Sequence, residues 1–227
     1  MRRPAGSSAI AATALLLTFA AFVALVAVLQ VARTDLDWQR ATLSLYLHGP
    51  HGLLLRAGYC ALALAIALLG TMLYRGFAPA ARSAAPLLLF VAAAAGLLGV
   101  AIGDSYLPAR APLLAPLVHA LAAQTAFLCV TSAMLLQSWR FRGDGYWRRL
   151  HPPAWWLAWL VFGLLWLHVL WRSAPRGLSQ KVVIAGVLCW LLLVAWWLRR
   201  RPSPEAAAGA QTRENVGDIP PKEDAPC

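Results

Sequence analysis

Long apolar blocks, separated by short stretches that carry arginine, are the feature of this 227-residue chain that most limits its fold. The first block, residues 5–32, contains no charged side chain. In the whole chain 60% of residues are hydrophobic and 13% are charged, about half the charged fraction of a soluble domain. Blocks of this length, without the periodic stripe of an amphipathic helix, are typical of segments that cross a membrane. The sequence therefore predicts an all-α, polytopic transmembrane helical bundle.

Six of these blocks are long enough to cross the hydrocarbon core as helices. The expected spans lie near residues 8–31, 53–74, 86–103, 113–137, 153–171 and 182–198. We expect residues 1–201 to form one six-helix membrane domain. Residues 202–227 are rich in Pro, Ala, Glu and Gly and have almost no large apolar side chains, which predicts a disordered tail.

The positions of Lys and Arg near the span ends predict the orientation of the chain in the membrane. With the N-terminus inside, eleven basic residues face the cytoplasm and seven face the other side. The two densest clusters, residues 140–149 and 199–201, both fall on the cytoplasmic side. Six spans return the chain to the side on which it began, so we expect both termini and the tail to be cytoplasmic.

The formal net charge of +11 is explained by these membrane loops. No zinc-finger spacing, glycine-rich phosphate loop or aromatic basic groove indicates a nucleic-acid partner. The expected partners are membrane lipids. The basic loop at residues 140–149 invites anionic lipids, although its role in fixing topology already accounts for its charge. The sequence does not indicate the oligomeric state.

The loop after the first span has a mixed character. A short helix capped at residue 34 or 35 would place Leu36, Leu43 and Leu47 on one face. Such a helix suits a segment that lies in the membrane interface. Gly49-Pro50 follows and is expected to break it.

Several of the few ionisable side chains are predicted to meet at the periplasmic face of the bundle. Four of the five histidines fall on this face, together with Ser44 and Asp104. Polar groups at membrane depth are costly, so a convergent set is a functional-site hypothesis. The candidate residues of this polar pocket are Asp104, His119, Ser44, His48, His51, His168, Arg56 and Arg110.

Asp104 and His119 are the members of this set that packing explains least. The third span is expected to end at Gly103, which places Asp104 at a helix C-terminus. The helix dipole is negative there and disfavours a carboxylate. His119 lies one or two turns inside the fourth span, among apolar and small residues.

The leading functional hypothesis is a pocket that binds a lipid headgroup or a small solute without chemistry. Arg56 and Arg110 would bind phosphate, and Ser44, Tyr46 and the histidines would supply hydrogen bonds. Whether the protein is an enzyme is left open, and the sequence implies no particular cofactor.

Two alternatives involve a cofactor. In a metal-dependent intramembrane hydrolase, Asp104, His119 and His48 or His51 would hold zinc and an activated water. The tight HxxxH or HExxH spacing that would strengthen this hypothesis is absent from the sequence. In a haem protein, His119 and His168 would be the axial ligands.

Five short motifs follow one another along the chain: Leu43-Ser44-Leu45-Tyr46, Gly49-Pro50, Gly70, Gly99-x-x-x-Gly103-Asp104 and His119. Their order and placement resemble the bacterial membrane family called domain of unknown function 998. The resemblance covers residues 10–200, all but the tail. It implies a six- or seven-helix protein of the bacterial inner (cytoplasmic) membrane and carries no settled activity.

More distantly, Ser44, His48, Asp104 and His119 are similar to the Ser, Asp and His set of the alkaline-ceramidase-like membrane hydrolases. Those proteins surround zinc with such residues at one membrane face. Their late HxxxH pair is absent from this sequence, where His168 stands alone in a late helix. In helix number and loop polarity the chain also resembles the Frag1 and DRAM-like membrane proteins.

Overall fold

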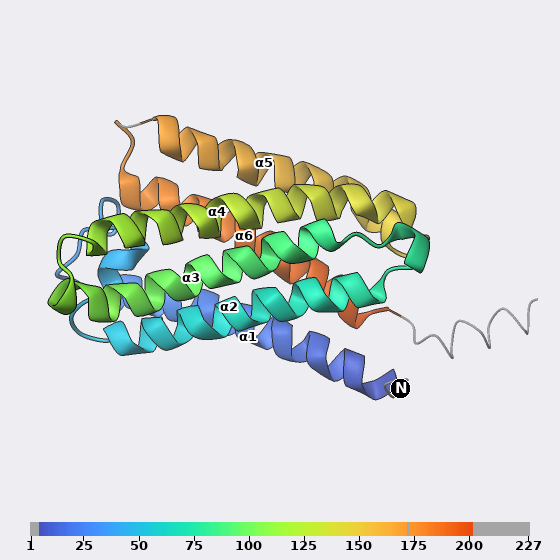
Figure 1. The fold of residues 1–227 in the computed structure, drawn as a ribbon, viewed down its shortest axis with the longest axis horizontal. Helices are drawn as coiled ribbons and strands as arrows, with labels where there is room; N and C mark the ends of the chain where they lie inside the picture. Colours follow the sequence, from blue (N-terminus) through green and yellow to red (C-terminus); the bar gives the residue numbers. More distant parts are fainter. Residues whose placement is uncertain (1–4, 172, 202–227) are drawn as a thin grey trace, which may run out of the picture.

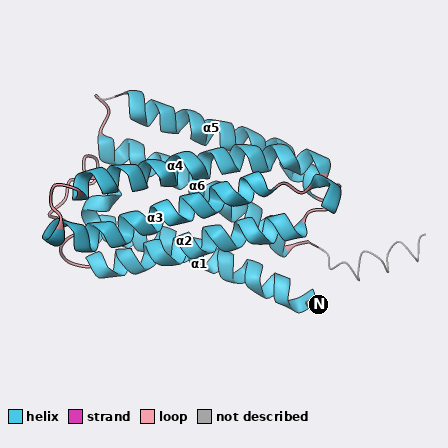
Figure 2. Ribbon diagram, in the orientation of Figure 1, coloured by secondary structure: helices cyan, strands magenta, loops and turns pink. Residues whose placement is uncertain are grey.

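The computed structural model describes residues 5–171 and 173–201 (Figure 1). Within these ranges the chain contains six α-helices, four short 3-10 helices and no strand (Figure 2). The α-helices are α1 (Ala5–Ala32), α2 (Gly52–Gly76), α3 (Ala84–Arg110), α4 (Ala115–Arg140), α5 (His151–Leu170) and α6 (Arg176–Arg199). The predicted all-helical fold with six apolar spans is confirmed. The predicted tail, residues 202–227, lies outside the described residues.

All six α-helices are long and apolar enough to cross a membrane. Many of their large apolar side chains face outward: Leu53, Leu170 and Trp156 expose 77%, 72% and 71% of their surface. An apolar surface this extensive would be costly in water, whereas hydrocarbon solvates it. The outside of the bundle therefore suits a lipid environment.

Helices that follow one another in the sequence pack side by side, and α6 packs back against α1 (Figure 1). The closest approach joins α3 to α4. A Cβ atom on Gly96 would lie 2.7 Å from both the backbone O of Ala122 and the backbone N of Ala126. Glycine at this position lets the two backbones approach, as small residues do at other membrane helix crossings.

Two helices are longer than the apolar runs that predicted them. α3 continues beyond Gly103 to Arg110 and stops where Pro112 disfavours a helical conformation at the preceding residue. Ala111 accordingly has φ −145° and ψ 68°. α6 begins directly after Pro175 rather than at residue 182. Backbone hydrogen bonding thus continues past the points where hydropathy falls.

Residues 33–51, here called the capping segment, close one end of the bundle. The expected helix from residue 34 or 35 is wrong, because turns occupy this stretch and the helical portion is the 3-10 helix η1 (Leu43–Leu47). Leu43, Tyr46 and Leu47 are buried. When these side chains are buried between the helices, more of their apolar surface is removed from water than if η1 lay along the membrane interface.

The opposite end of the bundle, here called the basic end, is built from the α2–α3 and α4–α5 connections and the end of α6. Its short helices are η2 (Pro79–Ala81), η3 (Phe141–Gly143) and η4 (Trp147–Leu150). The rings of Phe77, Phe141 and Trp147 stack there, with centroids 4.9 to 6.0 Å apart. This aromatic stack fixes the connections to the helices that they join.

Candidate functional site

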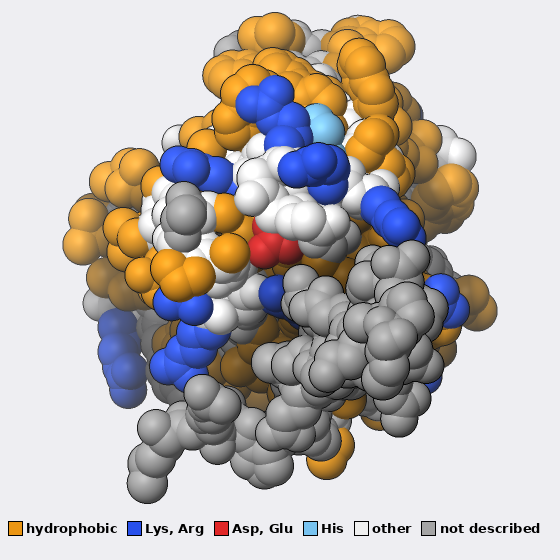
Figure 3. Space-filling view, turned by 90° about the vertical axis from the view of Figure 1, so that its right-hand side faces the viewer, with side chains coloured by type: hydrophobic (Ala, Val, Ile, Leu, Met, Phe, Trp, Pro, Cys, Tyr) orange, Lys and Arg blue, Asp and Glu red, His pale blue; other side chains and the backbone are white. Residues whose placement is uncertain are grey.

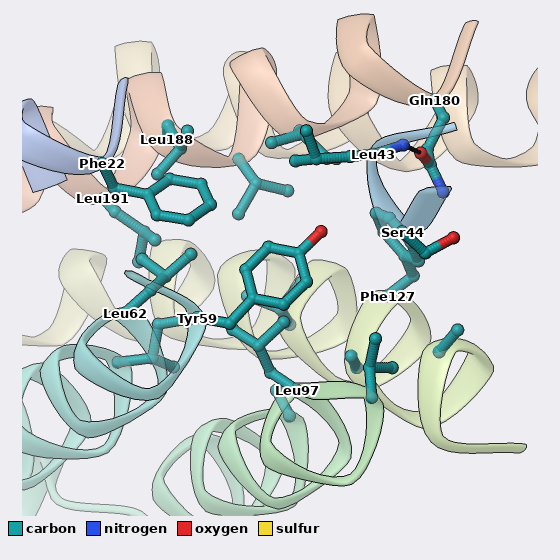
Figure 4. Close-up of a pocket in the computed structure, with 18 of the residues that line it drawn as sticks. Phe22, Leu43, Ser44, Tyr59, Leu62, Leu97, Phe127, Gln180, Leu188 and Leu191 are labelled. Carbon is teal, nitrogen blue, oxygen red and sulfur yellow. Dashed lines mark hydrogen bonds between the residues drawn. The ribbon is translucent and has the colours of Figure 1, made fainter. Parts of the chain in front are cut away.

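An internal cavity of about 90 Å³ lies within the bundle, next to the capping segment (Figure 4). Among the described residues, α1, α2, α3, α4, α6 and η1 contribute to its lining, and α5 does not. One water molecule needs about 10–15 Å³ of such space. The cavity is therefore large enough for several waters or for a portion of an organic molecule.

The polar side chains of the lining gather at one end of the cavity. Tyr59 lies in the third turn of α2, and His119 and Gln180 lie in the second turns of α4 and α6, all near the end closed by the capping segment. Ser44 comes from η1 itself. Figure 4 shows Ser44 and Gln180 at this end and the Tyr59 hydroxyl directed into the interior. Hydrogen-bonding groups from four elements thus converge on one small volume.

The other end of the cavity is apolar. Phe22, Leu62, Leu188 and Leu191 lie there, away from Gln180 (Figure 4). Gln180 and Leu191 are eleven residues apart on α6, which corresponds to about 16 Å along a helix. This length is roughly half of the about 30 Å thickness of a hydrocarbon core.

Gln180 joins the cavity to the capping segment. Its Oε1 accepts a hydrogen bond from the backbone N–H of Leu43 at 2.8 Å, across 137 residues of sequence. The Ser44 hydroxyl lies 3.2 Å from the Thr42 hydroxyl. The polar end of the cavity is thereby organised by contacts between η1 and α6.

The capping segment is organised around the buried side chain of Arg33, which is 5% exposed. Its Nε and Nη2 donate to the two carboxylate oxygens of Asp35, both at 2.8 Å, and its Nη1 donates to the carbonyl of His48 at 2.7 Å. These hydrogen bonds lower the pKa of Asp35 and raise the pKa of Arg33. A Cβ on Gly49, which has φ +78°, would lie 3.4 Å from Arg33 Nη2. Glycine at this position permits both the left-handed backbone and the close arginine.

Further hydrogen bonds fasten the capping segment to α6. Lys181 Nζ donates to the carbonyls of Trp38 at 2.5 Å and Ala41 at 2.9 Å. The backbone N–H of Leu178 donates to the carbonyl of Gln39 at 2.7 Å. The segment is therefore a fixed portion of the fold, lying across the end of the cavity.

The capping segment is also tied to α1 and α2. The Tyr46 hydroxyl donates to Gln30 Oε1 at 3.0 Å, and burial raises the pKa of Tyr46. Arg56 Nη2 donates to the carbonyl of Leu47 at 3.0 Å. The guanidinium of Arg56 thus contacts the backbone of η1, and its expected role in binding phosphate stays a prediction.

The structure brings two of the sequence-derived candidates, Ser44 and His119, to the same cavity. Three others do not line it. His48 and His51 are exposed on the capping segment, and His168 Nδ1 lies 2.7 Å from the Ser179 hydroxyl.

The remaining two candidates, Arg110 and Asp104, belong to the last turns of α3. Arg110 is exposed and does not line the cavity. Asp104 was expected at a helix C-terminus, and that position is wrong because α3 continues to Arg110. Asp104 therefore does not lie at the negative end of the helix dipole. The side chain of Asp104 lies outside the described residues.

Sequence reasoning assigned no role in the pocket to Tyr59 and Gln180. Gln180 was assigned to a loop because the sixth apolar run was taken to begin at residue 182. A helix start after Pro175 would have placed Gln180 one turn inside a membrane helix. A polar side chain at such a position indicates a candidate functional site. Tyr59 provided no such signal, because tyrosine is common near the ends of membrane helices.

The metal and haem alternatives stay predictions, because the side chain of Asp104, a candidate metal ligand, lies outside the described residues. Within residues 5–171 and 173–201, no group of three or more described His, Cys, Asp and Glu side chains is arranged to hold a metal ion. Of the expected haem pair, His119 lines the cavity, whereas His168 is bonded to Ser179 outside it.

Six long apolar helices with apolar side chains on their outer surface define a multi-pass membrane protein. The chain matches the family described as "Protein of unknown function (DUF998)" over residues 16–197, and it belongs to that family. The resemblance in the motifs is thereby confirmed. No curated protein matches the chain, and no solved structure does.

Proposed function

We propose that this protein binds a lipid or another small amphipathic molecule in the internal cavity. The observation that carries the proposal is the division of the lining into a deep apolar region and a polar end. The apolar portion of the ligand would lie near Phe22 and Leu191. Its polar group would meet Ser44, His119 and Gln180. Small-molecule sites typically combine such an apolar lining with a few converging polar groups.

The volume limits the ligand. An engineered apolar cavity of about 150 Å³ holds benzene, and this cavity measures about 90 Å³. A slender chain of several methylene groups fits a cavity of this volume better than a ring system does. A whole lipid would leave some of its length outside the cavity or would require the helices to separate.

We further propose that the chain lies in a bacterial inner membrane with both termini in the cytoplasm. Arginine is concentrated at the basic end, where α1 starts and α6 ends, and cytoplasmic loops are rich in Lys and Arg. The capping segment and the polar end of the cavity then face the periplasm. Alkaline phosphatase fused after Ser173 should be active and a fusion after Arg142 inactive. The reverse pattern would refute this orientation.

The ligand proposal can be tested with a long-chain fatty acid that carries a diazirine group near its methyl end. After irradiation of the detergent-purified protein, mass spectrometry should find the label on lining peptides of α2 and α6. Ala123→Phe fills the cavity from α4 and should reduce this labelling at least tenfold. Leu121→Phe introduces the same side chain on the exposed face of the same helix, where Leu121 is 56% exposed, and should leave labelling unchanged.

Ala123→Leu is a milder filling variant in case the phenylalanine prevents folding, because overpacking a core costs about 1–3 kcal/mol. Labelling that is spread evenly over lipid-facing peptides would contradict the proposal. So would equal labelling of the Ala123 and Leu121 variants at equal melting temperature.

A further inference from the structure

The basic end carries far more positive than negative charge. Blue arginine side chains are spread over this end, with a small acidic patch among them (Figure 3). The arginines are Arg75, Arg82, Arg140, Arg142, Arg148, Arg149, Arg199, Arg200 and Arg201. The acidic side chain that the described residues place here is Asp144.

Asp144 does not neutralise these arginines. It is 6% exposed, and its carboxylate accepts hydrogen bonds from the backbone N–H groups of Ala78, Tyr146 and Trp147 at 3.3, 3.0 and 3.4 Å. Its charge is therefore used to hold the α2–α3 and α4–α5 connections together. Both ion pairs found among the described residues lie in the capping segment, at the far end of the molecule.

An open groove of about 530 Å³ lies at this end, between the α2–α3 connection and the end of α4. It is lined by Ala78, Ala81, Trp139, Arg140, Arg142 and Gly143. The guanidinium of Arg142 stacks on the Trp139 ring, 3.1 Å from its centroid. Stacking leaves the N–H edge of a guanidinium available to an anion. Arg140 Nε is buried and has no hydrogen-bond partner among the described residues.

An aromatic ladder leads from this groove along α5 toward the middle of the membrane. Trp139, which lines the groove, contacts Trp155 at a centroid distance of 5.5 Å. Trp155, Trp159, Phe162 and Trp166 follow at successive distances of 5.7, 6.0 and 6.1 Å. Trp159 and Trp166 are 45% and 44% exposed. Trp155 and Trp166 are eleven residues apart, about 16 Å along a helix, so the ladder is about as long as a leaflet is deep.

We propose that the groove binds the phosphate of an anionic phospholipid and that an acyl chain of the same lipid packs along the aromatic ladder. Arginine pairs with phosphate oxygens through charge-assisted hydrogen bonds. Basic pockets between membrane helices bind anionic headgroups in this way. A free phosphate ion would use the groove and not the ladder, whereas a second copy of the chain would cover the ladder without satisfying the arginines. This site is independent of the internal cavity.

The test measures lipid retention by native mass spectrometry of the full chain, with phosphatidylglycerol and phosphatidylethanolamine of the same acyl composition. The wild-type protein should retain phosphatidylglycerol preferentially. Arg140→Gln combined with Arg142→Gln should weaken that preference at least tenfold. Arg148→Gln combined with Arg149→Gln removes the same charge from exposed positions outside the groove and should change the preference less than twofold. Equal losses in the two double variants would overturn the proposal.

Four further measurements sharpen this test. Arg140→Lys combined with Arg142→Lys keeps the charge and should retain some of the preference, which guards against a folding defect in the glutamine variant. Trp159→Ala should weaken retention of phosphatidylglycerol and leave inorganic phosphate binding unaffected. Displacement of the lipid by millimolar inorganic phosphate alone would show a simple anion site and overturn the lipid assignment. A crosslink from position 159 to another copy of the chain, in place of lipid, would also overturn it.

Discussion

Replacing Arg33 by methionine should loosen the capping segment without unfolding the helical bundle. The side chain is 5% exposed and joins the beginning of the segment to its end. Nη1 donates to the carbonyls of His48 at 2.7 Å and Pro50 at 3.3 Å, and the guanidinium forms a two-pronged pair with Asp35. Methionine is similar to arginine in length, but it is apolar and can make none of these hydrogen bonds.

The expected magnitude follows from these bonds. A hydrogen bond from a charged donor contributes about 1.5–3 kcal/mol. The bond to His48 has good geometry, and the longer one to Pro50 adds little. Because the Asp35 side chain is 58% exposed, solvent screens the ion pair, which therefore adds little to the stability of the segment. We expect Arg33→Met to lower the free energy of opening the capping segment by about 2 kcal/mol, which is roughly a 30-fold effect.

Hydrogen–deuterium exchange of the detergent-purified protein measures this opening directly. The peptide covering residues 34–51, including the Leu43 amide that bonds to Gln180, should exchange roughly 30-fold faster in the variant. Arg40→Met is the matched control, because Arg40 is 86% exposed and lies 3.7 Å from Asp37. It should change exchange less than twofold. Equal acceleration in both variants would refute the reasoning that burial gives Arg33 its role.

Three other predictions follow from the same structure. The hydrogen bonds from Arg33 lower the pKa of Asp35, so their stabilisation is present above the ordinary carboxyl pKa of about 4 and is lost as pH falls through the lower folded value. Protection of the capping segment, corrected for the intrinsic exchange rate at each pH, should therefore fall modestly in acid in the wild type. Asp35→Asn should be only slightly less protected at pH 7, because solvent screens the pair, and should lack this acid step. Gly96→Ala places a Cβ against the α4 backbone and should cost about 1–3 kcal/mol in thermal or denaturant unfolding followed by tryptophan fluorescence. Gly163→Ala, where an added Cβ would meet no atom beyond the local backbone of its own helix within 4 Å, should be neutral or slightly stabilising. A loss equal to that of Gly96→Ala would contradict the role of close helix packing at Gly96. Asp144→Ala leaves three backbone N–H groups without their acceptor and should speed exchange at residues 77–83 and 144–150, with little change at residues 34–51.

The number of helices and their approximate bounds could be predicted because they depend on local properties. Hydrocarbon leaves the backbone no hydrogen-bond partner except itself, so each apolar run of sufficient length must form a helix. The ends were less predictable. α3 ends at Arg110, just before the residue that Pro112 restrains, whereas hydropathy predicted an end at residue 103. α6 begins directly after Pro175, whereas hydropathy predicted a start at residue 182.

The candidate site was only partly predictable, for a different reason. Ser44 and His119 were identified because they are polar near membrane depth, and both line the cavity. Gln180 was missed because the helix bound was misplaced. His48 and His51 lie at the correct end of the molecule but are exposed. Topology predicts how deep in the membrane a residue lies, but not whether its side chain points into the bundle or away from it.

The sequence by itself determined that this chain forms six apolar helices and belongs to its family, since both depend on residue type and order. Only the tertiary structure decided which faces point inward, where the cavity lies and that η1 is buried. In a soluble protein the change from apolar to polar marks the inward face of a helix. In a membrane both the lipid-facing and the core-facing sides are apolar, so that contrast is lost, and helix packing alone determines what lines the interior.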